Sequence, residues 1–184
     1  MKLPFCVAQK KSGHLELTKF TYMKYALSEG FTAKEEGAVF WRKFDGRNQF
    51  RVIADNFLEV FAQWVVRDEG GGYTRYWPYN QGTPVLTDGE QFEGTRPQRK
   101  VCFVVSPVEG NDKPAPVILI VNQSVAEQML MLATELQGLC VADFVILATG
   151  TGKNKQYSVR AMDPTPLNLE LEKVGRSIDI ASEL

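Results

Sequence analysis

Aromatic and basic side chains stand next to one another at several places in this 184-residue sequence. The densest segment, 73–79, holds three tyrosines and one tryptophan around Arg75. Flat rings stack on unpaired bases, and Lys or Arg side chains follow the phosphates of a single strand. The sequence therefore predicts a surface that binds single-stranded nucleic acid. Its candidate residues are Trp41, Arg42, Lys43, Arg51, Tyr73, Arg75, Tyr76, Trp77, Tyr79, Arg99, Lys153, Lys155, Tyr157 and Arg160.

For some of these rings a structural role is an open alternative. The rings of segment 73–79 can instead cover the end of a barrel as a small core, and Trp41 suits either role equally. Pro78 restricts this segment to an edge strand or a loop, and Tyr and Trp need a polar partner when they are buried. Other rings lie in apolar runs and are predicted core residues. These are Phe57, Phe61, Phe103 and Phe144.

Residues 148–154 resemble a phosphate-binding loop of nucleotide hydrolases but depart from it. The full pattern requires Gly, four residues, Gly-Lys and then Ser or Thr. Gly152 and Lys153 fit, whereas Leu147 stands at the first glycine position and Asn154 at the hydroxyl position. The residues after 155 alternate as a strand does, whereas such a loop must open a helix. We therefore expect a basic hairpin tip that can contact a phosphate backbone.

Signals for catalysis or metal binding are weak. The sequence has one histidine, His14, and three widely spaced cysteines, Cys6, Cys102 and Cys140. A structural zinc site needs four clustered ligands, and a hydrolytic triad needs a nucleophile motif that is not present. We expect a protein that is not an enzyme, binds no metal and needs no cofactor. The cysteines are expected to be reduced thiols of an intracellular protein.

The formal net charge is only −1, but the charge is unevenly distributed. Residues 1–67 carry eleven basic and seven acidic side chains, and residues 116–184 carry five and eight. A basic face that meets a polyanion explains this asymmetry, and so does chance. The sequence shows no signal peptide and no apolar stretch of membrane-spanning length. We expect a cytoplasmic protein, in the host-cell cytoplasm if it is viral, with no membrane partner.

Apolar alternation predicts a mostly-β fold with one or two helices from residue 37 onward. Residues 80–99 are predicted to form one long loop, and Asp55-Asn56 a break between strands. One helix is predicted over 124–137, with Ser124 and Glu127 as a capping box and Gly138 at its end. The predicted strands are 38–44, 49–54, 57–67, 100–107, 117–121, 143–148 and 156–161, with an edge strand or loop at 73–79.

A helix placed before the last hairpin of a small β domain favours an OB-fold-like barrel of five to six strands. We assign this domain to residues 37–166. Residues 1–36 are predicted to be an N-terminal arm or a short helix. Residues 167–184 are predicted to be a C-terminal tail or helix.

Residues 37–166 resemble phage-encoded single-stranded-DNA-binding proteins with an OB fold. The resemblance rests on segment 46–53, on Tyr76-Trp77 before Gly82-Thr-Pro84, on 117–124 before the helix, and on the hairpin 142–159. It implies binding of single-stranded DNA largely without sequence specificity, during replication and recombination. Replication or recombination proteins are then further partners. A departure is the C-terminal segment, where Lys173 and Arg176 offset the acidic residues that a family tail would carry.

A second hypothesis is a protein-interaction module of a viral replication or transcription complex, such as a polymerase-binding factor. In that case the predicted loop at residues 80–99 would be the contact surface.

Overall fold

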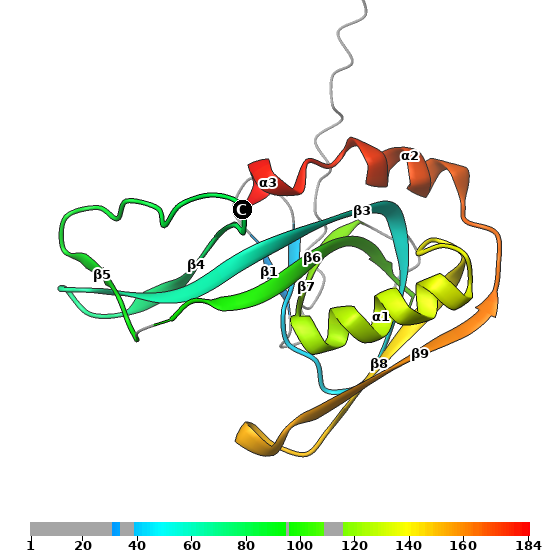
Figure 1. Cartoon of the computed structure of the whole chain (residues 1–184), viewed down its shortest axis with the longest axis horizontal. Helices are drawn as coiled ribbons and strands as arrows, with labels where there is room; N and C mark the ends of the chain where they lie inside the picture. The colour runs from blue at the N-terminus through cyan, green and yellow to red at the C-terminus, as the bar shows by residue number, and fades with distance from the viewer. Residues whose placement is uncertain (1–30, 34–38, 95, 109–115) are drawn as a thin grey trace, which may run out of the picture.

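The computed structural model describes residues 31–33, 39–94, 96–108 and 116–184 (Figure 1). Most of the predicted N-terminal arm, 1–36, lies outside the described residues. Within them are three α-helices, α1 (Gln123–Glu135), α2 (Leu169–Ser177) and α3 (Ile180–Glu183), and a 3₁₀ turn, η1 (Gly152–Asn154). The strands are β1 (Phe31–Ala33), β2 (Val39–Trp41), β3 (Gly46–Arg67), β4 (Gly72–Pro78), β5 (Glu90–Phe92), β6 (Gln98–Pro107), β7 (Val117–Asn122), β8 (Ala142–Thr149) and β9 (Gln156–Pro164).

The described strands form one sheet in the order β1-β2-β7-β6-β3-β8-β9, and β4 and β5 also pair with β3. The predicted mostly-β class is confirmed. The predicted OB-fold-like barrel of five to six strands is not confirmed, because nine described strands form a sheet whose order does not return to its start. The physical reason lies at β7, where β2 pairs in parallel through Phe40–Ile118 and Trp41–Leu119. β2 thereby occupies an edge that a closing strand would need.

β3 is the longest strand, and it serves two parts of the molecule. Its first half pairs with β8 and β6, and its second half pairs with β6, β4 and β5. The β3–β6 register shifts between Val52 and Phe57, which is a bulge inside a continuous strand. The predicted break at Asp55-Asn56 is therefore wrong, since a bulge bends a strand without ending it. Phe57, a predicted core residue, is 40% exposed beside this bulge.

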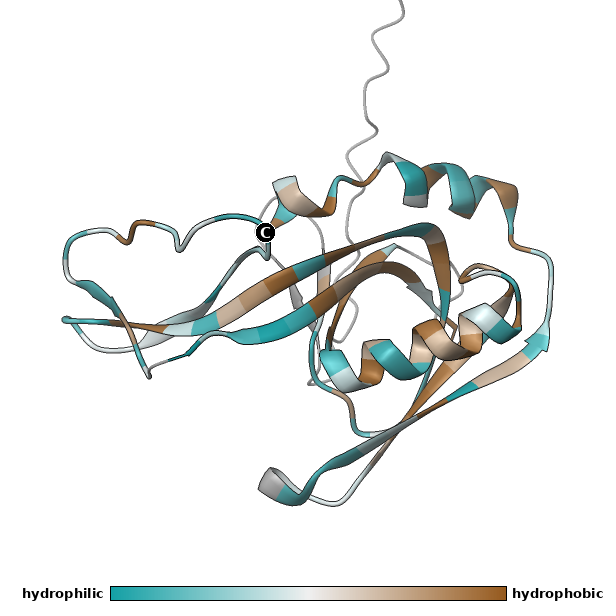
Figure 2. Ribbon diagram, in the orientation of Figure 1, coloured by the Kyte–Doolittle hydropathy of each residue, from teal (hydrophilic) through white to brown (hydrophobic). Residues whose placement is uncertain are grey.

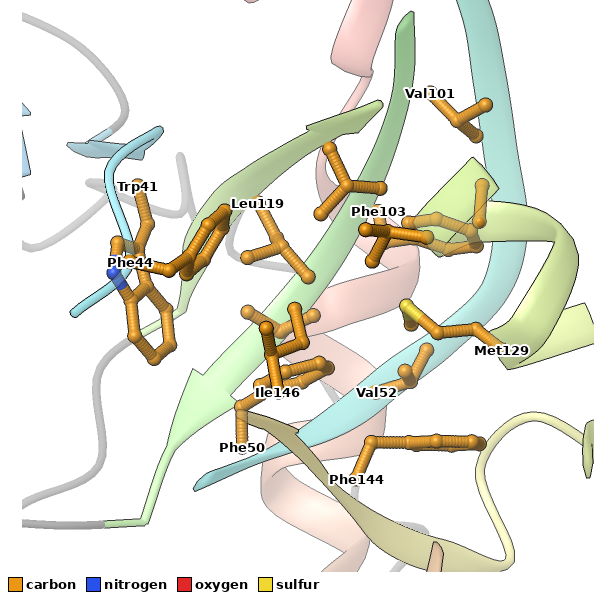
Figure 3. Close-up of a cluster of buried hydrophobic side chains, with 14 of the residues drawn as sticks. Trp41, Phe44, Phe50, Val52, Val101, Phe103, Leu119, Met129, Phe144 and Ile146 are labelled. Carbon is orange, nitrogen blue, oxygen red and sulfur yellow. The ribbon is translucent and has the colours of Figure 1, made fainter. Parts of the chain in front are cut away.

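One face of the sheet and α1 enclose the inner core, which Figure 3 shows in close-up. Phe50, Phe103 and Phe144 are fully buried there, as predicted for the last two. The helix contributes Val125, Met129 and neighbouring residues from one side, because positions four apart lie on the same helix face. The inner core includes Trp41, Phe44, Phe50, Val52, Val101, Phe103, Leu119, Met129, Phe144 and Ile146.

Helix α1 confirms the predicted helix but corrects both of its ends. It begins at Gln123, and the side chain of the N-cap residue Asn122 makes no capping hydrogen bond. The predicted capping box at Ser124 is therefore wrong. At the other end Gln137 takes the left-handed conformation, with φ of 61°, and the Gly138 N–H donates to the Ala133 carbonyl at 2.8 Å. The helix thus ends at Glu135, and the left-handed residue that terminates it is Gln137, one residue before the predicted Gly138.

The opposite face of the sheet carries a second cluster, which we call the outer core. Helices α2 and α3 cover it, so the predicted C-terminal tail or helix is helical (Figure 1). Ile180 of α3 is buried there, and Leu171 of α2 packs against the cluster. None of the helices in the described ranges is long and apolar enough to cross a membrane. The buried residues of the outer core are Phe40, Ile53, Ala54, Val60, Cys102, Val104, Ile118, Ile120 and Ile180.

We call the two cores, with the strands and helices that enclose them, the body. The second half of β3 extends beyond the body together with β4 and β5, and we call this extension the arm (Figure 1). Trp77 packs between Phe61 and Phe92, with ring centroids 5.7 and 5.6 Å away. Figure 2 shows β3 and β6 hydrophobic across the body and more mixed along the arm. Segment 73–79 is therefore largely an edge strand, one of the two predicted outcomes. The predicted loop 80–99 is wrong in part, because it contains β5 and the start of β6.

Glycine at position 175 allows α2 to approach β3 closely. A Cβ atom there would lie 2.4 Å from the Ile53 carbonyl oxygen, and backbone cannot yield as a flexible side chain can. Gly175→Ala should therefore lower the free energy of unfolding by about 1–3 kcal/mol, as overpacking does. Denaturant unfolding measures this loss, and Lys173→Ala on the exposed face of the same helix should change it little. Equal stability of the two variants would contradict this packing.

Candidate nucleic-acid interface

A cleft of about 190 Å³ opens at the edge of β7, beyond the short pairing of β7 with β2. We call it the seam cleft. It receives side chains from β4, β6, β7, α1 and β9 and from the segment that follows β2. The lining residues are Arg42, Phe44, Tyr76, Lys100, Ile120, Asn122, Val125 and Tyr157.

Arg42 enters this cleft between two rings. Its guanidinium carbon lies 4.9 Å from the ring centroid of Phe40 and 4.9 Å from that of Tyr76. These are cation–π distances, which hold the cation without neutralising it. The Nε atom of Arg42 is buried and has no hydrogen-bond partner among the described residues. An unsatisfied buried donor is costly, and a bound anion is one group that could satisfy a guanidinium at this place.

Lys100 supplies a second cation on the same side of the sheet. Its Nζ atom donates a hydrogen bond to Oδ1 of Asn122, the residue paired with it across β6 and β7. Burial lowers the pKa of Lys100 below its ordinary value of 10.5, because burial disfavours the charged form.

Neither cation of the seam cleft has a carboxylate partner in the described part of the chain. Other cations of the molecule are paired: Arg51 with Asp143 and Lys155 with Asp45. The cleft therefore concentrates uncompensated positive charge in a partly enclosed place. Such a place attracts anions more strongly than an open surface does.

Two tyrosines lie beside these cations. Tyr76 is half-buried, and burial raises its pKa, so that its hydroxyl stays neutral. Tyr157 is also half-buried and makes a T-shaped contact with Phe44 at 6.2 Å. Each tyrosine combines a partly accessible ring with a polar end, a combination that is common at wet interfaces.

Three of the fourteen predicted site residues thus meet in the seam cleft: Arg42, Tyr76 and Tyr157. They come from three distant parts of the chain, and the sheet brings them together. Lys43 is exposed just after β2. Lys155 is near the hairpin tip and is paired with Asp45. Lys153 belongs to η1, but its side chain lies outside the described residues.

Two predicted stacking residues are buried instead. Trp41 is 5% exposed in the inner core (Figure 3), and its Nε1 donates to the Lys43 carbonyl at 3.1 Å. Trp77 is 4% exposed within the arm. A ring must present an open face to stack on a base, so a contact with nucleic acid does not fit either residue. For both, the alternative of a structural role explains the position.

Arg51 also has a structural position. It is buried, and its Nε lies 2.5 Å from Oδ1 of Asp143. Its Nη1 donates to the carbonyls of Cys140 and Thr165 at 3.2 and 2.9 Å, and its Nη2 donates to the Thr165 hydroxyl. These bonds tie β3 to β8 and to the segment after β9. They leave Arg51 unsuited to the predicted contact with phosphate.

The remaining predicted residues lie away from the seam cleft. Side chains alternate between the two faces of a strand, and the pairing of Phe61 with Trp77 and Arg99 puts these on the arm face opposite to Tyr76. On that face the Arg99 guanidinium carbon lies 4.3 Å from the Tyr79 ring centroid. The same alternation separates Arg160 of β9 from Tyr157. Tyr73, Arg75, Tyr79, Arg99 and Arg160 therefore do not share the cleft.

Five lining residues were not among the predicted site residues: Phe44, Lys100, Ile120, Asn122 and Val125. Lys100 begins the predicted strand 100–107. Its place two residues before Cys102 was the only sequence signal that these two residues share a face. Its contact with Asn122 depends on the β6–β7 register, which a single sequence does not specify.

The described residues include no group of three or more His, Cys, Asp or Glu side chains that could hold a metal ion. Burial raises the pKa values of the Cys102 and Cys140 thiols to about 12. Both thiols are therefore protonated at neutral pH and poor nucleophiles. Comparison of the chain with protein families, with curated proteins and with solved structures finds no match.

Lys100→Met should raise the free energy of unfolding at neutral pH by about 1 kcal/mol, because it removes a half-buried cation that has no acidic partner among the described residues. The folded protein holds the pKa of Lys100 below 10.5, so the unfolded chain binds more protons between the two values. Wild-type stability then rises with pH in that window, and the advantage of the variant shrinks there. Urea unfolding at neutral and alkaline pH tests this.

The matched control is Lys173→Met on α2, which removes an exposed lysine. It should show no pH-dependent gap of this kind. A Lys100→Met protein that is less stable than the wild type at neutral pH would contradict the conclusion that the charge of Lys100 destabilises the folded protein.

Proposed function

We propose that this protein binds single-stranded DNA, largely without sequence specificity, through the seam cleft. Its role would be to protect exposed strands during DNA replication and recombination, as in the phage proteins that the sequence resembles, without catalysing a reaction. One observation carries the proposal: Arg42 and Lys100, two cations that have no carboxylate partner among the described residues, share a cleft with the half-buried rings of Tyr76 and Tyr157.

Each part of this site matches a part of a single strand. A cation attracts phosphate whatever base is attached to it, and a tyrosine ring can stack on any base. Such stacking contributes about 1–3 kcal/mol per base. A duplex buries its base faces, so tyrosines in a cleft favour unpaired strands.

The connections of the sheet support an OB-like assignment of the body. In order, β3, β6 and β7 precede α1, and β8 and β9 follow it. The first of these strands is long and bent and pairs with the second and the fourth. OB folds are partly open barrels that bind oligonucleotides on the face of their second and third strands. Those strands are here β6 and β7, which provide Lys100 and Asn122.

The direct test is a titration of fluorescently labelled oligo(dT), and of duplex DNA of equal length, at two salt concentrations. We expect tighter binding to the single strand and a steep loss of affinity with salt. The slope of log affinity against log salt is about −0.7 per neutralised phosphate for single strands. The double variant Arg42→Gln/Lys100→Met should bind more weakly, with a slope shallower by about 0.7 for each phosphate that it no longer neutralises.

The matched control is Lys173→Met/Arg176→Gln, which removes the same two charges from the exposed surface of α2. It should keep the affinity and slope of the wild type, apart from a small change due to net charge. Equal affinity for duplex and single strand, or equal losses in the two double variants, would contradict the proposal. Absence of any DNA binding would leave the protein-interaction module as the better hypothesis.

A further inference from the structure

Trp64 differs from the other two tryptophans of the protein. It is 44% exposed on the arm, whereas Trp41 and Trp77 are 5% and 4% exposed. An indole is a large apolar group that usually gains from burial. Its exposure on a paired strand is a feature that the fold of the body does not require.

The neighbouring strand is shaped to receive this indole. A Cβ atom at Gly72 would lie 2.3 Å from the carbonyl oxygen of Val65, and 2.8 Å from Nε1 and 2.9 Å from Cε2 of Trp64. The backbone of Gly72 is not in the left-handed region that favours glycine. Glycine is therefore needed here for close approach, and the indole lies against the backbone of β4. The exposed area of the ring then lies on the side turned away from that strand.

Trp64 lies on the same face of the arm as the seam cleft. It pairs with Thr74, and Tyr76 is the next residue of β4 on that face. Diagonal neighbours of this kind are about 7–8 Å apart in an antiparallel pair. Two partly exposed rings thus follow one another from the cleft along the arm.

The strand residues of this face carry no acidic side chain between the cleft and Trp64. The row beside Trp64 consists of Gln98, Ala62 and Tyr76, and the next row contains Lys100 and Val60. A phosphate backbone that runs from Lys100 to Trp64 therefore meets no carboxylate from these two rows. Glu93, whose N–H donates to the Trp64 carbonyl at 2.9 Å, lies beside Trp64 just after β5. The carboxylate of Glu59 and the guanidinium of Arg75 lie on the opposite face by alternation.

We infer that Trp64 is a base-stacking platform that extends the binding of a single strand from the seam cleft onto the arm. The inference rests on the proposed function and adds a specific residue and direction to it. The indole offers one flat face held by Gly72, and the ligand is the next unpaired base of the strand that Tyr76 contacts.

A purely structural role is the competing explanation, because an aromatic ring that covers a strand glycine can fix strand register. Two substitutions separate the roles. Trp64→Leu still covers Gly72 with apolar atoms but cannot stack on a base. Trp64→Tyr keeps a flat ring. A structural role is measured by thermal unfolding, whereas stacking is measured by affinity.

The experiment combines two measurements on the full chain with oligo(dT). Anisotropy of a labelled oligonucleotide reports binding, and tryptophan emission of the protein with unlabelled oligonucleotide reports the environment of Trp64. Because Trp41 and Trp77 are buried, quenching on binding should come from Trp64. Trp64→Leu should bind about 5- to 150-fold more weakly, the range for one stacked base. Trp64→Tyr should recover most of the affinity and show no quenching.

The control is Tyr79→Leu, which removes a ring of 39% exposure from the opposite face of the arm. It should leave both the affinity and the quenching unchanged. Binding by anisotropy with unchanged emission, and equal affinity of Trp64→Leu and the wild type, would overturn the inference while the proposed function stands. Failure of the wild type to bind oligo(dT) would instead remove the proposed function.

Discussion

The placing of aromatic and basic side chains on one face of the arm depends on the bulge in β3, where β3 has an odd number of extra residues relative to β6. Between the pairs Val52–Val105 and Phe57–Phe103, β3 advances five residues and β6 advances two, an excess of three. Because side chains alternate with a period of two, an odd excess moves each later side chain to the opposite face. Even-numbered residues of β3 face the inner core before the bulge, and after it they face the outer side. Trp64 consequently shares a face with Lys100.

This exchange of faces separates the part of β3 that encloses the inner core from the part that carries the proposed binding surface. Before the bulge, β3 helps to enclose the inner core with α1, and Arg51 fixes its first half to Asp143. After the bulge, its outer face is covered by α2 and α3 only as far as the outer core extends. Where that cover ends, Tyr76 still packs against the outer core and, together with Lys100, lines the seam cleft. The cations there keep an energetic cost that a ligand of opposite charge could offset.

The sequence predicted much of the local structure because strand alternation and helix periodicity are local signals. Strands β6 and β7 and helix α1 were predicted for that reason. The sequence could not predict that β2 occupies the edge of β7, that Asp55-Asn56 forms a bulge, or that Lys100 meets Asn122, since each depends on pairing between distant segments. Residue type alone also could not separate Tyr76 from its buried neighbour Trp77, because strand direction decides which face each one takes.

We propose that an unpaired strand binds in the seam cleft, at the edge of β7. Backbone amide chemical shifts of the ¹⁵N-labelled protein, recorded during a titration with oligo(dT), test it most directly. The account predicts that the largest shifts occur around Tyr76, Lys100, Asn122 and Tyr157, with small shifts in α2. Shifts confined to α2, α3 or the arm face that carries Tyr79 and Arg99 would contradict it.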